Sequence, residues 1–448
     1  MIKELFIKDV RCFPGEQRIR IRPLTFLVGE NSTGKTTALG CFNAMVNIDR
    51  AAIQGSRQLD FNLEPYRMGA FWDIARKTEK VTQNECGSFT LGLGLDNPEI
   101  GSVEVFFEFE EVGSEPSLTA VKFKFSEEEM IIYELTSASS RNEHHTKDSS
   151  AEFHIKKEEG KNIFVVKSTN PGFLFLFDMR LGEEKTASGV RELKELRKFL
   201  VKKDPQAGKR TSFPLLHILL NEFEAPISMA PIRSKPQRTY DPLTEARTAE
   251  GSDVPMYLMR LKRTGVREEK QVRDSLLDFG KKSGLFTAVN VKTYGEGMNE
   301  PFQLQVNVRG VDANILDVGY GVSQLLPILV RIFANRGPRF FLLQQPEVHL
   351  HPRGQAELTS LFISSIKEDQ HKFIVETHSD YMIKRARIEI RRNRIEPDDV
   401  SLVYFKPEGK QVRVHNIDFD ESGNLLNAPP DYQQFFLEES DRFLGFKD

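Results

Sequence analysis

Residues 29–37 read Gly-Glu-Asn-Ser-Thr-Gly-Lys-Thr-Thr, a complete match to the glycine-rich loop that binds phosphates. Gly29 and Gly34 allow the backbone to curl until its N–H groups point at phosphate oxygens. The pattern places Lys35 on the β- and γ-phosphates and the Thr36 hydroxyl on Mg²⁺. The loop residues predicted to bind a nucleoside triphosphate are Gly29, Asn31, Gly34, Lys35, Thr36 and Thr37.

The segments on either side of this loop have the context that it requires. Leu24–Val28 is a short apolar run typical of a buried strand. Residues 37–45 can form a helix, and its N-terminus would face the phosphates. A strand before the loop and a helix after it favour nucleotide binding over a glycine turn that matches the pattern by chance.

Composition narrows the class of protein. The 448 residues can form two or three domains' worth of core, and a net charge of −3 means that any nucleic-acid contact needs a local basic patch. Cys12, Cys41 and Cys86 lack metal-ligand spacing, and their odd number suits a reducing compartment. The charged N-terminus is unlike a signal peptide, and no apolar run reaches about 18 residues. We therefore expect a cytoplasmic protein without membrane spans.

Periodicity predicts an α/β chain. Residues 136–150 are polar and predict an exposed loop, whereas 186–223, including an apolar segment from Phe213 to Phe223, has helical spacing. Helical periodicity returns at 253–281. Strand-like runs lie at 2–10, 17–21, 89–96, 103–110, 119–125, 163–167, 302–308, 340–343 and 373–375.

Three downstream segments carry further chemistry. Gly319–Gln324 begins a predicted helix, where N–H groups and the Ser323 hydroxyl suit a γ-phosphate. An apolar strand then ends in Gln344-Gln-Pro-Glu347, the place where a phosphate-loop ATPase holds its metal-binding and water-activating side chains. A last strand precedes Glu376-Thr-His-Ser-Asp380, in which His378 could position water.

These four motifs, in this order, resemble the ABC-type ATPases of the RecF, SMC and OLD (overcoming lysogenization defect) group. The opening segment Arg11-Cys-Phe13 and the central Ala230-Pro-Ile-Arg233 fit the same group. The resemblance covers residues 1–110 and 226–420. It implies an ABC-type phosphate-loop ATPase head with a mixed sheet, made from residues 1–111 and 226–448, and an inserted α+β arm at 112–225.

The resemblance also implies partners and cofactors. ATP with Mg²⁺ would bind at Lys35, and Ser323 of a second copy would close over it, giving a homodimer or a higher homo-oligomer. Many relatives act on DNA. Others are ATPase components of anti-phage systems that act with a separate effector such as a nuclease, and we find no nuclease motif in this chain. We therefore expect an ATPase sensor or scaffold of anti-phage defence that acts with a separate effector. The alternatives are a RecF-like DNA repair ATPase and a nucleotide-gated scaffold that does not hydrolyse ATP.

One departure from the group bears on activity. Relatives usually have acidic residues where this chain has Gln344 and Gln345, and an amide brings no charge and cannot act as a base. Glu347 is the remaining carboxylate of the segment. Either Glu347, helped by a histidine (His349, His351 or His378), activates water slowly, or the chain binds ATP and barely hydrolyses it, or one glutamine was introduced to trap a bound state. The predicted catalytic residues are Glu347, His378 and Gln345, and the predicted Mg²⁺ ligands are Thr36 and Gln344.

A basic run follows the His378 motif. It contains Lys384, Arg385, Arg387, Arg391, Arg392 and Arg394. Such a run can bind a phosphate backbone, but the favoured interpretation is the solvated face of a helix.

Overall fold

The computed structural model places the chain in two compact units. The first contains residues 1–21, 32–225 and 407–414, and the second contains residues 22–31, 226–406 and 415–448. The described residues are 1–48, 59–77, 87–97, 101–125, 129–135, 151–158, 161–168, 177–178, 212–213, 224–241, 247–265, 267–295 and 300–432.

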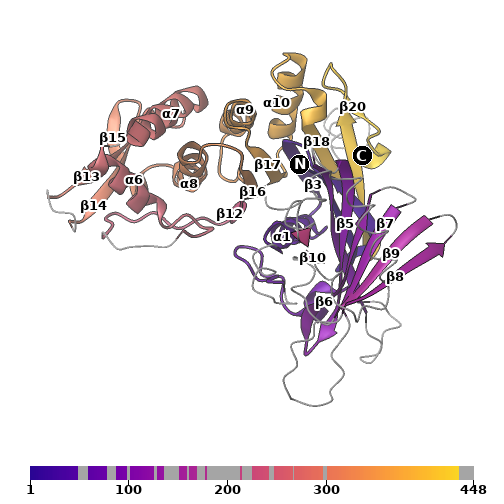
Figure 1. The fold of residues 1–448 in the computed structure, drawn as a ribbon. Helices are drawn as coiled ribbons and strands as arrows, with labels where there is room; N and C mark the ends of the chain where they lie inside the picture. Colours follow the sequence, from indigo (N-terminus) through magenta and orange to yellow (C-terminus); the bar gives the residue numbers. More distant parts are fainter. Residues whose placement is uncertain are drawn as a thin grey trace, which may run out of the picture. The chain divides into compact units, whose positions relative to one another are not determined.

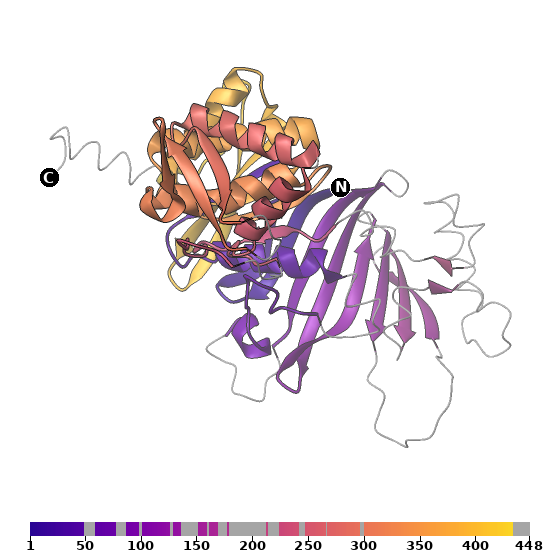
Figure 2. The ribbon, with the colours of Figure 1, turned by 90° about the vertical axis from the view of Figure 1, so that its left-hand side faces the viewer.

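An eight-stranded sheet forms the frame of the first unit, with the order β2-β1-β4-β5-β6-β7-β9-β8 (Figure 2). Neighbours are antiparallel except for the parallel pair β7 and β9. In β5, buried Val103, Val105, Phe107 and Phe109 alternate with less buried residues, two of which are glutamates, the pattern of a strand with one covered face. The strands are β1 Ile2–Val10, β2 Phe13–Arg20, β4 Phe89–Asn97, β5 Gly101–Val112, β6 Glu115–Lys124, β7 Glu129–Leu135, β8 Ala151–Glu158 and β9 Lys161–Ser168.

Helix α1, Lys35–Val46, packs on β1 and β4 of this sheet. It is buried on nearly all sides, and Gly40 lets it approach Met68 and Tyr66, because a Cβ there would lie 3.0 Å from Met68 Sδ. The unit also contains the short helix α3, Phe71–Ile74, and a pair of two-residue strands, β10 Phe177–Asp178 and β11 Ser212–Phe213.

The second unit is built on a seven-stranded mixed sheet with the order β12-β16-β17-β3-β18-β19-β20 (Figure 1). From β12 to β18 the neighbours are parallel, and β20 pairs antiparallel with β19. The strands are β12 Ile227–Met229, β16 Phe340–Gln344, β17 Lys372–Glu376, β3 Leu24–Gly29, β18 Val400–Glu408, β19 Gln411–Phe419 and β20 Leu425–Leu426. Because β16 and β17 are buried on both faces, they read as continuous apolar runs.

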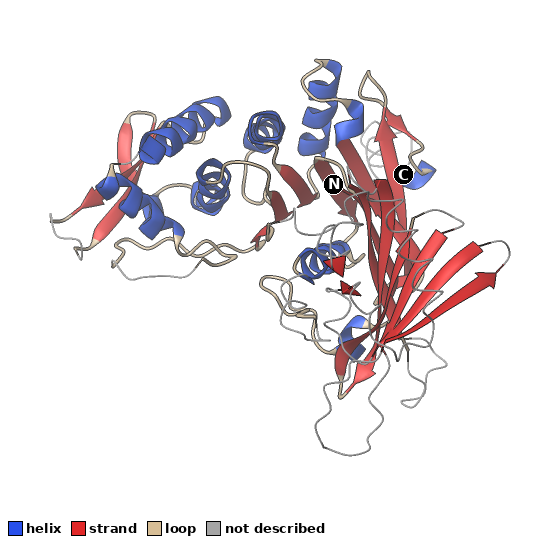
Figure 3. Cartoon of the chain, viewed as in Figure 1, coloured by secondary structure: helices blue, strands red, loops and turns tan. Residues whose placement is uncertain are grey.

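Helix α8, Tyr320–Ala334, precedes β16, whereas α9, Pro352–Asp369, connects β16 to β17 and α10, Asp380–Arg391, lies between β17 and β18. α9 packs against α10 and lies near β3, and α7 packs on α8, α9 and β13 (Figure 3). The further elements are α6 Val254–Thr264, α7 Arg267–Ser283, the antiparallel sheet β13 Ala288–Thr293, β14 Phe302–Val308 and β15 Val311–Asn314, and the 3₁₀ turns η4 Ile315–Asp317, η5 Pro397–Asp399 and η6 Pro430–Tyr432.

The structure confirms the predicted α/β class and every predicted strand listed above. The helical prediction at 253–281 is confirmed by α6 and α7. One prediction is wrong at its edge: Phe213 lies in β11, because it pairs with Phe177, rather than in a helix. The rest of 186–223 and the loop at 136–150 lie outside the described residues. The strands from β6 to β9 extend the sheet of β1, β4 and β5, and the inserted arm at 112–225 stays a prediction.

Candidate functional site

The predicted phosphate-binding loop connects β3 of the second unit to α1 of the first. Its backbone takes positive φ angles at three positions, Gly29 (145°), Ser32 (62°) and Gly34 (85°). Alternation of this kind turns successive N–H groups toward one side and makes an anion-binding concavity. The local backbone is therefore suited to phosphate.

Gly34 is required by packing as well as by conformation. A Cβ atom there would lie 2.6 Å from Phe13 Cζ and 2.7 Å from Cys12 Sγ, closer than real carbon contacts. Gly34 is also the N-cap of α1, so no capping side chain competes with an anion there, and its carbonyl accepts from the Ala38 N–H at 2.9 Å. The first turn has no acidic residue, which leaves the positive end of the helix dipole uncompensated by side chains of that turn.

The three residues that follow Gly34 differ in exposure. Lys35 is buried, Thr36 is exposed, and Thr37 is buried with its hydroxyl accepting from Arg11 Nη1 at 3.1 Å. Arg11 also donates to the carbonyls of Met68 at 2.8 Å and Asp73 at 2.9 Å. Arg11 thus anchors the first turn of α1. Asn31 is exposed.

The second unit brings three predicted segments to one edge of its sheet. In the parallel register Gln344 of β16 lies beside Glu376 of β17, and Glu376 lies beside Leu27 of β3. The Gln345 N–H donates to the Glu376 carbonyl at 2.8 Å, and the Thr377 N–H donates to the Leu27 carbonyl at 3.1 Å. The start of the phosphate loop, the Gln344 segment and the His378 segment therefore leave the sheet at its carboxyl edge, where α/β folds bind ligands.

Glu347 is the buried carboxylate of this edge, with 7% of its surface exposed. Its Oε1 accepts from the Thr377 hydroxyl at 2.8 Å and from the His378 N–H at 2.9 Å. In the described part of the chain no hydrogen-bond donor reaches Oε2. Burial raises the pKa of the Glu347 carboxyl, while these hydrogen bonds and the Arg233 charge oppose the increase. Glu347 therefore has one oxygen held by two hydrogen bonds and one oxygen without a hydrogen-bond partner in the described part of the chain.

The two glutamines differ in setting. Gln344 is buried, and its Nε2 has no hydrogen-bond partner among the described residues. Gln345 is half-buried and takes a positive φ of 42°, which turns the chain after the strand. The unpaired Gln344 and Glu347 atoms are polar groups that a nucleotide, its Mg²⁺ or water could satisfy, so the residues present fit ATP with Mg²⁺.

The histidines have separate local roles. His378 is exposed and contributes its backbone N–H to Glu347. The His349 ring packs edge-on against Tyr320, with centroids 4.9 Å apart. His351 is the N-cap of α9, and its Nδ1 accepts from the Arg353 N–H at 3.2 Å. Of these three histidines, His378 is the one that hydrogen-bonds to the Glu347 carboxylate, and it does so through its backbone N–H.

Ser323 lies in the fourth residue of α8, which begins at Tyr320. It is buried, and its hydroxyl donates to the Tyr320 carbonyl at 2.8 Å. Gly321 lets the helix start lie close to the next loop, because a Cβ there would be 2.5 Å from the His349 carbonyl oxygen. The Ser323 hydroxyl thus points into its own helix, and its contact with a second copy's nucleotide stays a prediction.

Two residues at this site were not singled out from the sequence. Thr377 positions Glu347, and Arg233 is a fully buried cation beside it. The motif Ala230-Pro-Ile-Arg233 fitted the family, but nothing in it indicates which groups Arg233 contacts.

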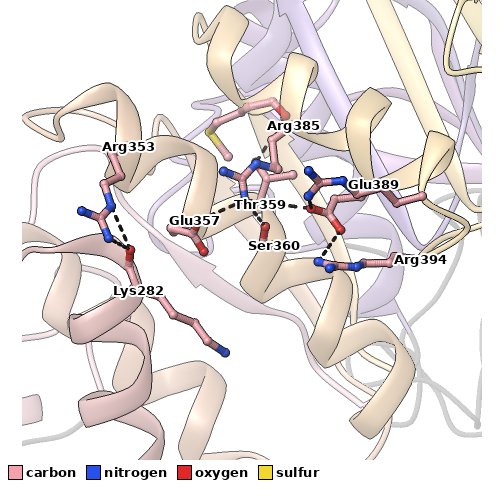
Figure 4. A network of polar contacts seen from close by, with 10 residues as sticks. Lys282, Arg353, Glu357, Thr359, Ser360, Arg385, Glu389 and Arg394 are labelled. Carbon is pink, nitrogen blue, oxygen red and sulfur yellow. Dashed lines mark hydrogen bonds and ion pairs between the residues drawn. The ribbon is translucent and has the colours of Figure 1, made fainter.

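Side chains of the basic run hold α10 to neighbouring segments (Figure 4). Arg385 binds Glu357 and Ser360 of α9, and Arg394 binds Glu389. Arg387 and Arg391 donate to the carbonyls of Gly423 and Ser422. Lys384 pairs with Asp380, and Arg392 lies 3.9 Å from Glu389. These contacts favour a structural role for the run over a patch for a phosphate backbone.

A comparison with protein families decides the wider assignment. A family model described as "AAA domain, putative AbiEii toxin, Type IV TA system" matches residues 24–384. The chain belongs to this family. The AAA assignment confirms the nucleotide-binding fold that the motifs indicated, because the matched range includes the phosphate loop, the Gln344 segment and His378.

Solved structures similar to this AAA chain include heads of SMC proteins. A Smc head bound to the C-terminal winged-helix domain of ScpA is 11% identical, with a TM-score of 0.42 over 94% of this chain and 98% of that one. The SMC head of Thermotoga maritima is 11% identical, with a TM-score of 0.39 over 92% and 98%. A Smc head bound to the C-terminal domain of ScpA, from Pyrococcus furiosus, is 10% identical, with a TM-score of 0.39 over 98% and 99%.

The search of curated proteins gave no match. Among the described residues, no helix of the AAA chain is long and apolar enough to cross a membrane. The same part of the chain holds no group of three or more His, Cys, Asp or Glu side chains that could form a metal site.

Proposed function

We propose that this AAA chain binds ATP with Mg²⁺ and hydrolyses it slowly, with Glu347 as the group that accepts a proton from the attacking water. The observation that carries the proposal is the geometry of Glu347. It is buried at the carboxyl edge of the sheet, one oxygen is fixed by Thr377 and His378, and the other is uncommitted. A base with a raised pKa and a fixed orientation is the arrangement that general-base catalysis uses.

The other predicted residues have supporting roles in this proposal. Lys35 binds the β- and γ-phosphates, the N–H groups from Gly29 to Thr37 surround them, and Asn31 lies within the same loop. Thr36 and Gln344 would hold Mg²⁺, which when bound offsets phosphate charge. His378 fixes Glu347 through its N–H and presents an exposed ring at the same place.

Hydrolysis is slow in this proposal because Gln344 and Gln345 bring no negative charge. An amide oxygen is a weaker Mg²⁺ ligand than a carboxylate, and Gln345 can orient water but cannot deprotonate it. The same two residues favour a second candidate function, a scaffold that is gated by bound ATP and does not hydrolyse it.

The wider role follows from the family. The family is named after a putative toxin of a toxin–antitoxin system, which supports a cytoplasmic component of anti-phage defence that dimerises around ATP and controls a separate effector. In this proposal Ser323 contacts the nucleotide of the second copy after its hydroxyl leaves the Tyr320 carbonyl. The intramolecular contacts of the basic run give a RecF-like repair role less support.

The test is single-turnover ATP hydrolysis with Mg²⁺ by the wild type, Glu347→Gln and Lys35→Ala, with Lys367→Ala as a control at an exposed lysine. We expect slow turnover in the wild type and in Lys367→Ala, bound but intact ATP in Glu347→Gln, and loss of ATP binding in Lys35→Ala. Intact bound ATP in the wild type as well would support the scaffold. Normal binding by Lys35→Ala would refute the phosphate-loop assignment.

A further inference from the structure

Arg233 is the largest fully buried polar side chain of the second unit, with 1% of its surface exposed. It follows β12, and its main chain is held by one side chain of α8. The Arg233 N–H donates to Gln324 Oε1 at 3.1 Å, and Gln324 Nε2 donates back to the Arg233 carbonyl at 3.5 Å. Gln324 is the residue after Ser323, so α8 holds the backbone of Arg233 close to the predicted nucleotide contact at Ser323.

The guanidinium of Arg233 reaches the end of β16. Its Nη2 donates to the Gln344 carbonyl at 3.0 Å and to the Gln345 carbonyl at 3.5 Å. Its Nε and Nη1 are buried and have no hydrogen-bond partner among the described residues. Desolvation lowers the pKa of Arg233 to about 10, and the charge of Glu347 acts against this decrease. Burial of a cation with two unpaired donors costs free energy of folding. Its position beside Glu347 therefore indicates a function beyond packing.

The same helix meets the Glu347 loop at a second point. Gly321 of α8 lies against the His349 carbonyl, two residues after Glu347. Within the second unit, the start of α8 therefore contacts both sides of the Gln344–His349 segment, directly at His349 and through Arg233 at Gln344. A movement of the first turns of α8 would therefore displace the Glu347 carboxylate through either contact.

We infer that Arg233 is a positioning residue, which keeps the end of β16 and the Glu347 carboxylate in register with the N-terminal turns of α8. It makes the carboxylate site sensitive to what happens at Ser323, because residue 324 holds Arg233 and residue 323 is predicted to meet the nucleotide of a second copy. The inference rests on the proposed function of Glu347.

The polar and charged groups around Glu347 set its pKa, and with it the pH dependence of hydrolysis. His378 donates its N–H, Glu376 ends the neighbouring strand, and His349 follows in the same loop. Arg233 is the charged side chain that lowers the Glu347 pKa. Removal of its charge should therefore raise the Glu347 pKa further and move the acid limb of the pH–rate profile to higher pH.

The experiment measures single-turnover hydrolysis against pH for the wild type, Arg233→Met, Arg233→Lys and Gln324→Met. We expect the acid limb of Arg233→Met to move to higher pH, and Arg233→Lys to restore part of this shift. Gln324→Met keeps the charge, so its acid limb should stay while its rate falls several-fold. Arg331→Met is the matched control, because Arg331 is also a buried arginine; it lies on α8, the helix of Gln324, and its ion pair is with Asp253. Its acid limb should not move.

A double-mutant cycle between Arg233→Met and Glu347→Gln, measured by chemical unfolding, tests the same contact without turnover. We expect Glu347→Gln to stabilise the Arg233→Met background more than the wild type, since it removes an uncompensated charge. An unmoved acid limb together with additive unfolding effects would overturn the inference. Absence of Glu347-dependent turnover in the wild type would instead remove the proposed function, and the cycle would still decide whether Arg233 supports the carboxylate.

Discussion

Glu347 and Glu389 are both buried glutamates of the second unit, with 7% and 1% of their surfaces exposed, yet their surroundings are opposite. Glu389 lies among three arginines: Arg394 binds Oε2 at 3.1 Å, and Arg385 and Arg392 lie 3.9 Å from Oε1. Glu347 has two neutral donors on one oxygen and a single nearby cation.

The difference separates structure from chemistry. Three cations around Glu389 compensate its charge, and its ion pair with Arg394 ties α10 to the turn that follows the helix (Figure 4). Glu347 lies instead at the carboxyl edge of the sheet, the place where α/β folds in general bind ligands. Burial and one oxygen without a hydrogen-bond partner among the described residues are common to both glutamates, so the surrounding charges and the place in the sheet are what distinguish them.

The largest expected effect is on turnover. Glu347→Gln should lower single-turnover ATP hydrolysis by about 100-fold or more, because the amide cannot accept a proton. Rapid-quench analysis of bound nucleotide gives the rate, and ATP affinity should change little. Turnover within a few-fold of the wild type would assign the base to another residue, and Glu347 would then have no catalytic role to set against the structural role of Glu389.

The corresponding change in the other glutamate should act on stability. Glu389→Gln leaves three arginines without their shared anion, and we expect a loss of about 2 kcal/mol of unfolding free energy, less than for a fully buried pair because Arg392 and Arg394 are largely exposed. Urea unfolding measures it, with the exposed Glu368→Gln as the control. Unchanged stability, or a hydrolysis defect in folded protein, would contradict the structural role.

A smaller effect is expected from the support of Glu347. Thr377→Val removes the hydroxyl that binds Oε1 and also accepts from the Ser379 N–H at 2.9 Å. We expect a stability loss of about 1 kcal/mol and a rate reduced roughly five-fold. Thr359 is a buried threonine of α9 whose hydroxyl donates to the Met382 carbonyl of α10. Thr359→Val is therefore the matched control and should leave the rate unchanged. Equal rates for the two variants would remove Thr377 from the site.

The smallest effect concerns pH and stability. The pKa of Glu347 is raised in the folded protein, so the folded state holds this proton more tightly than the unfolded chain. The contribution of the group to stability is therefore greatest at low pH and is lost as pH rises from the unfolded pKa through the folded pKa. Glu347→Gln should melt above the wild type near neutral pH, and this gap should close in acid. A constant gap in thermal scans between roughly pH 5 and 8 would exclude an effect of this titration.

Local patterns predicted the parts of the molecule that depend on neighbours in sequence. The glycines of the 29–37 loop specify their own backbone angles, and alternating residues in β5 specify a half-covered strand. Even the absence of charge at Gln344 and Gln345 is readable from the chain. The Glu347 carboxylate was predicted because it is the remaining acid of its segment.

Contacts between residues that are far apart in the chain could not be predicted from the sequence. Arg233 and Gln344 are 111 positions apart, and no pattern relates a buried guanidinium to a strand-end carbonyl. Ser323 shows a different limit. The helix was predicted, but its first residue decides where a side chain points, and a start at Tyr320 turns the Ser323 hydroxyl back to the Tyr320 carbonyl.

The place of β3 has a consequence for the synthesis of this protein. Leu24–Gly29 is made early, but the strands that flank it, β17 and β18, begin at Lys372 and Val400. A buried, strand-forming segment must therefore wait on the ribosome for most of translation before its hydrogen-bonding partners exist, the situation in which nascent chains aggregate or recruit chaperones. Truncation from either end removes part of that sheet, so expression of fragments is expected to fail where point variants succeed.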